Sequence, residues 1–189
     1  MTTVGELFDL AFAPFERTVG AFQGPHWDQA TVCDVSVREL VQHVVVGNEF
    51  AVRLLAGATA DEAVSGLDEV VCTGPDLVRA VAESCTAQTN AFTNADEALR
   101  LHHPTGEIDF DTFVRFRLGE LLVHGWDLAR ATGHSADFDA VVVRGLWTRV
   151  QGNVDAMRSM GAYGQGARGD RADDSSVEER LLDAFGRRW

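Results

Sequence analysis

Apolar residues recur at helical spacing along most of the chain, and capping signals mark where the predicted helices begin. Residues 3–22 carry such an apolar stripe, and Pro14 within it is expected to kink or split the helix. Ser36 is followed three residues later by Glu39, which is the sequence signature of a capping box. The pattern therefore predicts a second helix over about 36–56.

Further helices alternate with segments that contain glycine and proline. They are predicted over about 61–64, 74–92, 109–131, 139–157 and 175–186. The stretch 99–109 is expected to be an ordered loop, because Pro104 and Gly106 exclude a regular helix and no convincing strand alternation is present. Residues 161–174 are rich in Gly, Arg and Asp and have little to bury, which is typical of a flexible linker.

These elements predict an all-α protein, because amphipathic helices can bury their apolar faces against one another in a four-helix bundle. We expect the bundle over 1–160, the flexible linker over 161–174 and a short C-terminal helix over 175–189 that packs on the bundle. The connection over 57–73 is long enough to cross the bundle, so a simple up-down topology is not required.

Charge and composition narrow the classes of partner. The net charge of -13 disfavours nucleic acid, which needs a basic face, and also disfavours anionic lipid. There is no apolar run of about 18 residues and no signal-peptide pattern, so the expected location is the cytoplasm. All 16 basic residues are arginine, which excludes mechanisms that depend on a Schiff-base lysine or a phosphate-loop lysine.

The three cysteines, Cys33, Cys72 and Cys85, are odd in number and widely spaced. Without a CxxC pair, neither a disulfide framework nor a cysteine zinc site is supported. We expect them to be small buried residues in a reducing compartment, and nothing marks one of them as a nucleophile.

The candidate chemistry lies in the segment 117–133, where Glu120 and His124 are four residues apart. On a helix this spacing places both side chains on one face, within reach of a single metal ion. His43 lies in the middle of another apolar helix, and Gly47 leaves space beside it. Taken separately, the histidine is also compatible with a hydrogen-bonded structural role and the Glu/His pair with a solvated face.

Several motifs resemble one family. The strings LVQHVVVGN, VHGWDLARATG and RLLDAFGRRW, with the loop at residues 103–106, are similar to the DinB/YfiT-like helical bundles. More narrowly, they resemble the metal-binding domain of the mycothiol-dependent maleylpyruvate isomerases, over nearly the whole chain. The resemblance implies a four-helix bundle that holds one divalent metal ion on His43, Glu120 and His124. It also implies that the full isomerases carry a further C-terminal domain, for which this chain has no residues left.

Three protein ligands would leave an open coordination position, which is typical of a catalytic metal. We therefore expect a divalent-metal-dependent enzyme that activates a low-molecular-weight thiol or water for isomerisation or transfer on a small electrophile. The resemblance points to mycothiol as the thiol, and zinc is the favoured metal, with nickel or iron as alternatives. The alternatives are a non-catalytic bundle that binds a metal or small ligand and a structural bundle that binds a protein partner. The chain is expected to be a monomer or a homodimer.

Other polar residues could assist the metal ligands or contact a substrate. Asp127 lies three residues after His124 and could orient its imidazole. Asn48 and His103 could reach the mouth of the site. Any of the three arginines Arg53, Arg115 and Arg117 could bind a substrate carboxylate. No residue is assigned as the catalytic acid, base or nucleophile.

Overall fold

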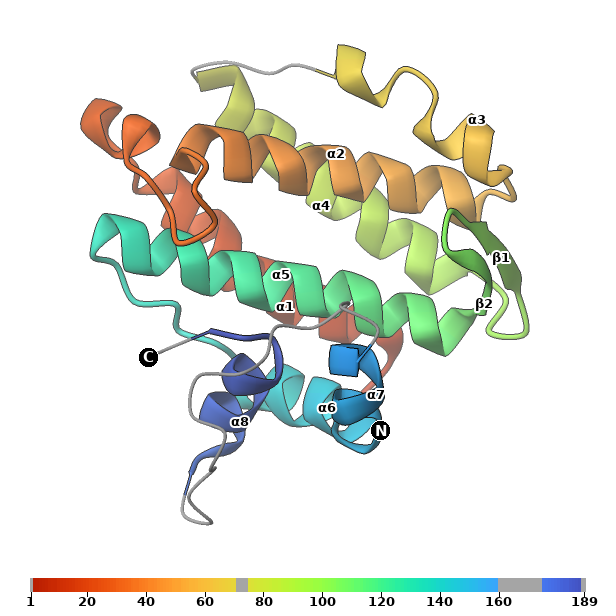
Figure 1. Ribbon diagram of the computed structural model, residues 1–189. Coiled ribbons are helices and arrows are strands. Elements are labelled where there is room, and N and C mark those ends of the chain that lie inside the picture. The colour runs from red at the N-terminus through yellow and green to blue at the C-terminus, as the bar shows by residue number, and fades with distance from the viewer. Residues whose placement is uncertain (1, 71–74, 160–174, 188–189) are drawn as a thin grey trace. The chain divides into compact units, whose positions relative to one another are not determined.

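The computed structural model describes residues 2–70, 75–159 and 175–187, and these residues are mostly helical (Figure 1). The chain divides into two compact units, 1–137 and 138–189. None of the helices described is long and apolar enough to span a membrane. The first unit contains α1 (Val4–Gly20), α2 (Val37–Leu55), α3 (Ala60–Val64), α4 (Pro75–Asn94), β1 (Arg100–His103), β2 (Gly106–Asp109) and α5 (Phe110–Thr132), and the second contains α6 (Ala140–Val150), α7 (Val154–Ser159) and α8 (Val177–Ala184).

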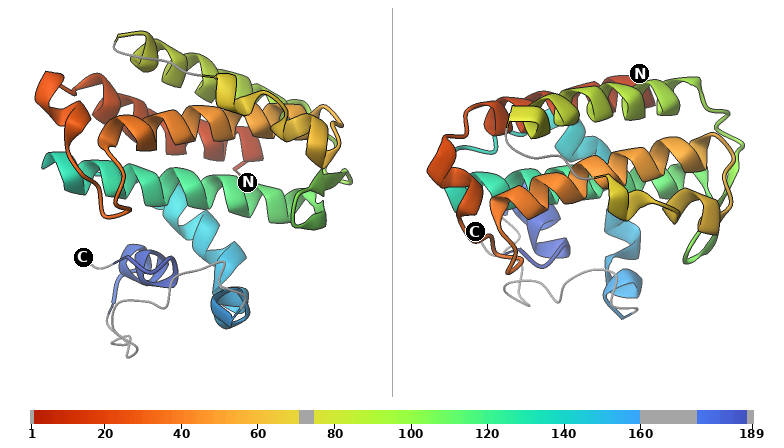
Figure 2. Two further views of the ribbon diagram at one scale, coloured as in Figure 1. Left: turned by 45° about the horizontal axis from the view of Figure 1, so that its top comes forward. Right: turned by 90° about the horizontal axis from the view of Figure 1, so that it is seen from above.

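Helices α1, α2, α4 and α5 form a four-helix bundle within the first unit (Figure 2). The main contacts join α1 to α4, α4 to α2, α2 to α5 and α5 to α1, so the four helices close a ring. The consecutive helices α1 and α2 therefore lie diagonally opposite each other, which differs from a simple up-down order. The predicted all-α four-helix bundle is confirmed.

Side-chain caps explain where two of the bundle helices begin. At the start of α2, the Ser36 hydroxyl accepts a hydrogen bond from the backbone N–H of Glu39 at 3.2 Å, and the Ser36 N–H donates to the Glu39 carboxylate at 2.7 Å. Asp109 caps α5 by accepting from the Thr112 N–H at 2.7 Å. Gly133 ends α5 at φ 72°, a left-handed conformation that glycine adopts without strain.

An aromatic cluster forms the centre of the bundle. Phe8 on α1 stacks on Phe92 of α4, with ring centroids 4.2 Å apart. Phe92 also contacts Phe110 and Phe113, both at the start of α5. These rings are almost completely buried and join three of the four helices, so they fix the position from which α5 extends toward the candidate site.

Pro14 does not split the first helix, contrary to one of the two outcomes predicted for it. Helix α1 continues through Pro14, whose side chain is buried. A proline inside a helix removes one backbone hydrogen bond and costs about 3 kcal/mol. The apolar stripe that includes Phe12, Phe15 and Val19 is buried on the bundle and offsets this cost.

The stretch predicted as a loop without strands is an antiparallel hairpin of β1 and β2. Arg100 pairs with Asp109 and His103 with Gly106, leaving a two-residue turn at Pro104 and Thr105. Each strand has only four residues, too short for an alternating pattern to be distinguished in the sequence. The prediction was wrong here because backbone pairing, rather than side-chain pattern, defines this element.

The helices of the second unit also differ in detail from the predicted helices. The helix expected over 139–157 is interrupted by a 3₁₀ segment, Gln151–Asn153, between α6 and α7. This segment contains Gly152, whose helix propensity is low. Helix α8 packs on α6 within the unit and is capped by Ser176. The chain divides after residue 137, whereas a boundary was expected at residue 160, and the whole of the predicted linker over 161–174 lies outside the described residues.

Candidate metal centre

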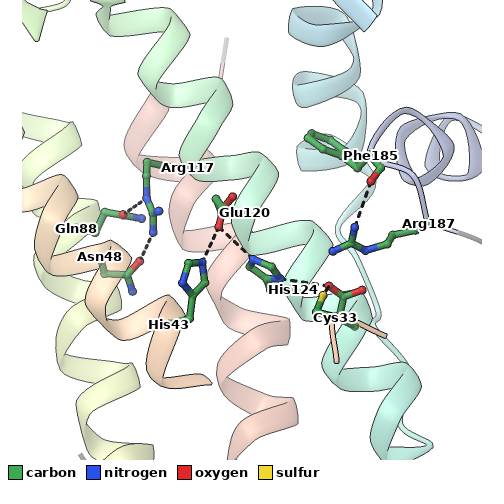
Figure 3. A network of polar contacts seen from close by, with 10 residues as sticks. Cys33, His43, Asn48, Gln88, Arg117, Glu120, His124, Phe185 and Arg187 are labelled. Carbon is green, nitrogen blue, oxygen red and sulfur yellow. Dashed lines mark hydrogen bonds and ion pairs between the residues drawn. The ribbon is translucent and has the colours of Figure 1, made fainter. Parts of the chain in front are cut away.

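His43, Glu120 and His124 converge between α2 and α5 (Figure 3). The Nε2 atom of His43 and the Nε2 atom of His124 each lie 3.1 Å from the same carboxylate oxygen of Glu120. The two imidazole rings are nearly perpendicular, with centroids 5.2 Å apart. The structure thus brings together the three residues that the sequence analysis proposed as metal ligands.

The donor spacing suits a tetrahedral metal ion. Three donor atoms, one from each side chain, all lie within 4.8 Å of one another. Two ligands about 2.0–2.1 Å from a zinc ion in tetrahedral geometry would be about 3.3 Å apart. The His43 side chain is 57% exposed and that of His124 only 13%, so the group is open to solvent on the α2 side. The residues present therefore fit a three-ligand ion with at least one position accessible to a small molecule.

Local sequence explains how α5 presents its two ligands. Glu120 and His124 are one helical turn apart and face the bundle partner α2, while Leu121 and Leu122 between them are buried in the core. His43 comes from α2, which contacts α5 directly. Two ligands on one helix and one on its neighbour give a group that only the packed bundle can assemble.

The electrostatics of the centre favour a bound cation. Burial alone would raise the pKa of the Glu120 carboxyl, but hydrogen bonds from His124 and His43 and the charge of Arg117 hold it well below its usual value. Burial would lower the pKa of His124, but the carboxylates of Asp127 and Glu120 outweigh that effect and raise it. A raised pKa favours the protonated ring, which cannot ligate a metal, so a proton and a metal ion compete for His124.

Asp127 supports His124 from the side away from Glu120. Its carboxylate is fully buried and lies 3.2 Å from His124 Nδ1. If Nδ1 carries the proton, Nε2 presents its lone pair toward the centre, which is the usual carboxylate–histidine–metal arrangement. The thiol of Cys33 donates to the same carboxylate oxygen at 3.3 Å. Asp127 was proposed from the sequence, whereas Cys33, 94 residues away, carried no recognisable signal.

Replacing Asp127 with asparagine is expected to weaken metal binding by about 10–100-fold, because the neutral amide orients and polarises the imidazole less strongly. Competition of the protein with a chromogenic chelator would measure the change. The control is Cys33→Ser, which keeps a hydrogen-bond donor beside Asp127 and should leave the affinity nearly unchanged. Equal losses in both variants would contradict the role of Asp127.

Asn48 is completely buried and does not join the metal ligands. Its amide oxygen accepts a hydrogen bond from Arg117 Nη2 at 3.0 Å, and its amide nitrogen donates to Ser84 at 3.1 Å. Gln88 on α4 accepts from Arg117 Nε at 2.9 Å. Asn48 therefore positions Arg117 beside the centre, and Gln88 is a member of this group that the sequence analysis missed.

His103 lies on the hairpin and not among the three ligands. Its ring packs edge-on against Phe50 and Phe116 and in a tilted arrangement against Phe113. Its Nδ1 atom accepts a hydrogen bond from the backbone N–H of Thr105 at 3.2 Å. Burial, aided by the positive charge of Arg117, lowers its pKa, so the neutral ring is favoured.

The remaining cysteines are not brought into the centre. Cys85 is buried on α4, where loss of solvation raises the pKa of its thiol far above the usual value. A thiol in this state is inert, as predicted. Cys72 lies outside the described residues.

Comparison with known proteins shows sequence and structural relatives. Two uncharacterized proteins from two strains of Mycobacterium tuberculosis are each 31% identical to this chain over 134 residues, which is 68% of this chain. The matched region covers 65% of each relative, so the chain spans less than two thirds of their length.

A solved structure has the same fold. It is a histidine-to-alanine mutant of the mycothiol-dependent maleylpyruvate isomerase, with a TM-score of 0.64 at 15% identity. The match covers 97% of this chain and 91% of that chain.

A family model matches residues 8–129, a range that runs from α1 to near the end of α5 and includes the three candidate ligands. Its description is the mycothiol maleylpyruvate isomerase N-terminal domain. The match covers more than half of the chain and agrees with the bundle of α1, α2, α4 and α5. This chain therefore belongs to the mycothiol maleylpyruvate isomerase N-terminal domain family, within the DinB-like helical superfamily.

Proposed function

We propose that the protein binds one divalent metal ion through His43, Glu120 and His124 and uses a low-molecular-weight thiol to isomerise or modify a small electrophile. The observation that carries the proposal is the position of two imidazole Nε2 atoms, each 3.1 Å from one Glu120 oxygen. Family membership favours mycothiol as the thiol. Zinc is the proposed metal, because two imidazoles and a carboxylate in tetrahedral spacing suit it, with nickel or iron as alternatives.

The chain's own residues would perform three tasks. His43, Glu120 and His124 hold the ion, and Asp127 fixes the ring of His124. The exposed side of His43 gives small molecules access from solvent. A bound divalent ion would supply Lewis acidity, which lowers the pKa of a thiol or water at the open position.

The thiol chemistry needs no oxidant or reductant. The thiolate adds to one carbon of a double bond conjugated to a carbonyl group, and the electron pair moves to the carbonyl oxygen. Rotation about the new single bond and loss of the thiolate give the isomerised double bond and regenerate the thiol. If the intermediate is instead protonated at carbon, the thiol stays attached and the net reaction is transfer.

Two measurements on the same preparation test the proposal. Protein purified without added metal is expected to contain about one zinc, nickel or iron ion per chain by elemental analysis. Mycothiol and maleylpyruvate-like electrophiles are then expected to give product only with the metal-loaded protein. Absence of stoichiometric metal would contradict the whole proposal. Bound metal without turnover for any pair of thiol and electrophile would favour a non-catalytic binding protein.

A further inference from the structure

A second group of candidate metal ligands lies on the side of His124 away from Glu120. The Sγ atom of Cys33, a carboxylate oxygen of Asp127 and a ring nitrogen of His124 all lie within 4.8 Å of one another. The Oδ2 atom of Asp127 lies 3.3 Å from Cys33 Sγ and 3.2 Å from His124 Nδ1. Figure 3 shows Cys33 and His43 on opposite sides of the His124 ring.

The separations of these donor atoms are close to those around a zinc ion. With a Zn–S bond of about 2.3 Å and a Zn–O bond of about 2.0 Å in tetrahedral geometry, sulfur and oxygen are about 3.5 Å apart. The same geometry places nitrogen and oxygen about 3.3 Å apart. The Asp127 oxygen is therefore already at ligand spacing from both of its neighbours. Thiolate, imidazole and carboxylate are all established zinc ligands, and a mixed set of this kind needs no CxxC pair.

The loop that carries Cys33 is fixed by its own hydrogen bonds. It lies between the 3₁₀ turn Gly24–Asp28 and α2. The hydroxyl of Thr31, a buried residue, accepts from the Cys33 N–H at 3.3 Å and donates to the Val35 carbonyl at 2.9 Å. The Thr31 N–H donates to the same carbonyl at 2.8 Å. Cys33 is only partly exposed, so its thiol is held beside α5 while solvent can still reach it.

The imidazole of His124 cannot serve both groups at once. A neutral imidazole has a lone pair on one nitrogen and a proton on the other. When Nε2 of His124 binds an ion together with His43 and Glu120, Nδ1 carries the proton and donates to Asp127. When an ion occupies Nδ1, the proton is on Nε2, which lies 3.1 Å from the Glu120 oxygen. The centre of His43, Glu120 and His124 then keeps only two of its ligands.

We propose that Cys33, Asp127 and His124 Nδ1 form a second metal site, which takes a thiophilic divalent cation of the zinc and cadmium class. Because the two sites share His124, an ion at the second site excludes metal from the first centre and inhibits any reaction that depends on it. Binding would release the thiol proton to solvent, and the thiolate and carboxylate would balance the charge of the ion. The thiolate favours soft cations, whereas the first centre offers only nitrogen and oxygen donors. The site stands without the proposed function, and only its inhibitory effect rests on it.

Cadmium titration of the full chain tests the second site, since a cadmium–thiolate bond has its own ultraviolet charge-transfer absorption. About one equivalent of cadmium is expected to saturate this band, and excess magnesium, which prefers oxygen ligands, should not compete. Cys33→Ser should remove the band. Asp127→Asn should weaken cadmium binding at least about tenfold, because a charged ligand is lost.

Cys72→Ser is the matched control for Cys33→Ser and should leave the cadmium band unchanged. His43→Ala removes a ligand of the first centre only, so cadmium should still give the Cys33-dependent band and bind at least as tightly as to the unaltered protein. A band that persists in Cys33→Ser, a band that Cys72→Ser removes, or no band at all would overturn the proposal. Loss of the band in His43→Ala would do the same.

Release of the resident metal tests the exclusion between the two sites. In the metal-loaded protein, about one equivalent of cadmium should displace the resident ion, as measured by elemental analysis after gel filtration, and Cys33→Ser should retain its ion. Equal release from both proteins would contradict the exclusion. Protein that is purified without metal but shows the Cys33-dependent band would contradict only the proposed function, whereas metal-loaded protein without that band would contradict only this inference.

Discussion

Replacing His124 with alanine is expected to remove stoichiometric metal and to lower metal affinity by more than about 100-fold. Loss of a residue that only supports a ligand costs about 10–100-fold, so loss of the ligand itself should exceed that range. His124 is the least exposed of the three candidate ligands and contacts both Glu120 and Asp127. Elemental analysis after gel filtration, together with chelator competition, would measure both quantities.

His102→Ala is the matched control for this experiment. His102 lies on strand β1 of the hairpin, is exposed, and is not among the residues that could hold a metal. Its replacement should leave metal content and affinity unchanged. Full metal content in His124→Ala would contradict the proposed centre, and a parallel loss in His102→Ala would show that metal binds elsewhere as well.

Most of the fold could be predicted because helix ends carry local chemical signals. Ser36 with Glu39, and Asp109 before α5, cap their helices through side chains that the sequence shows directly. The hairpin could not be predicted in this way, because it depends on backbone pairing between Arg100 and Asp109 and their neighbours. The order of the four helices around the bundle could not be predicted from the hydrophobic pattern of the sequence either. That order depends on how the side chains of different helices fit together.

The candidate site was partly predictable for a similar reason. The spacing of Glu120 and His124 on one helix is local, so their common face follows from the sequence alone. Glu120 and His124 lie close to His43 only because α2 contacts α5. The resemblance to known bundles suggested this contact. The role of Cys33 beside Asp127 depends on a long-range approach of a loop and has no local pattern at all.

Helix α5 carries residues for every part of the proposed function, at intervals of three or four positions. Phe113 anchors the helix in the aromatic cluster, and Arg117 follows one turn later. Glu120 and His124 supply two metal ligands, and Asp127 supports the second of them. Because these residues share one rigid helix, their relative positions depend on how firmly α5 is packed rather than on loops.

Replacing Phe92 with alanine tests this dependence and is expected to destabilise the protein by about 3–5 kcal/mol, out of a total of about 5–15 kcal/mol. Phe92 is 2% exposed and contacts Phe8, Phe110 and Phe113, so its loss leaves a cavity between α1, α4 and α5. Urea denaturation of the metal-free variant would measure the change in the free energy of unfolding. The control is Val64→Ala, at an exposed position of α3, which should alter stability by less than about 0.5 kcal/mol.

The same variant separates packing from ligation. Phe92 is not a proposed ligand, so the folded fraction of Phe92→Ala should still bind metal at the stoichiometry of the unaltered protein. Added metal should then raise the unfolding midpoint, since an ion that binds only the folded state stabilises it in proportion to the logarithm of its concentration. A variant that is as stable as the unaltered protein would show that the aromatic cluster does not hold α5. A folded variant that no longer binds metal would show that the ligand geometry depends on the exact placement of α5.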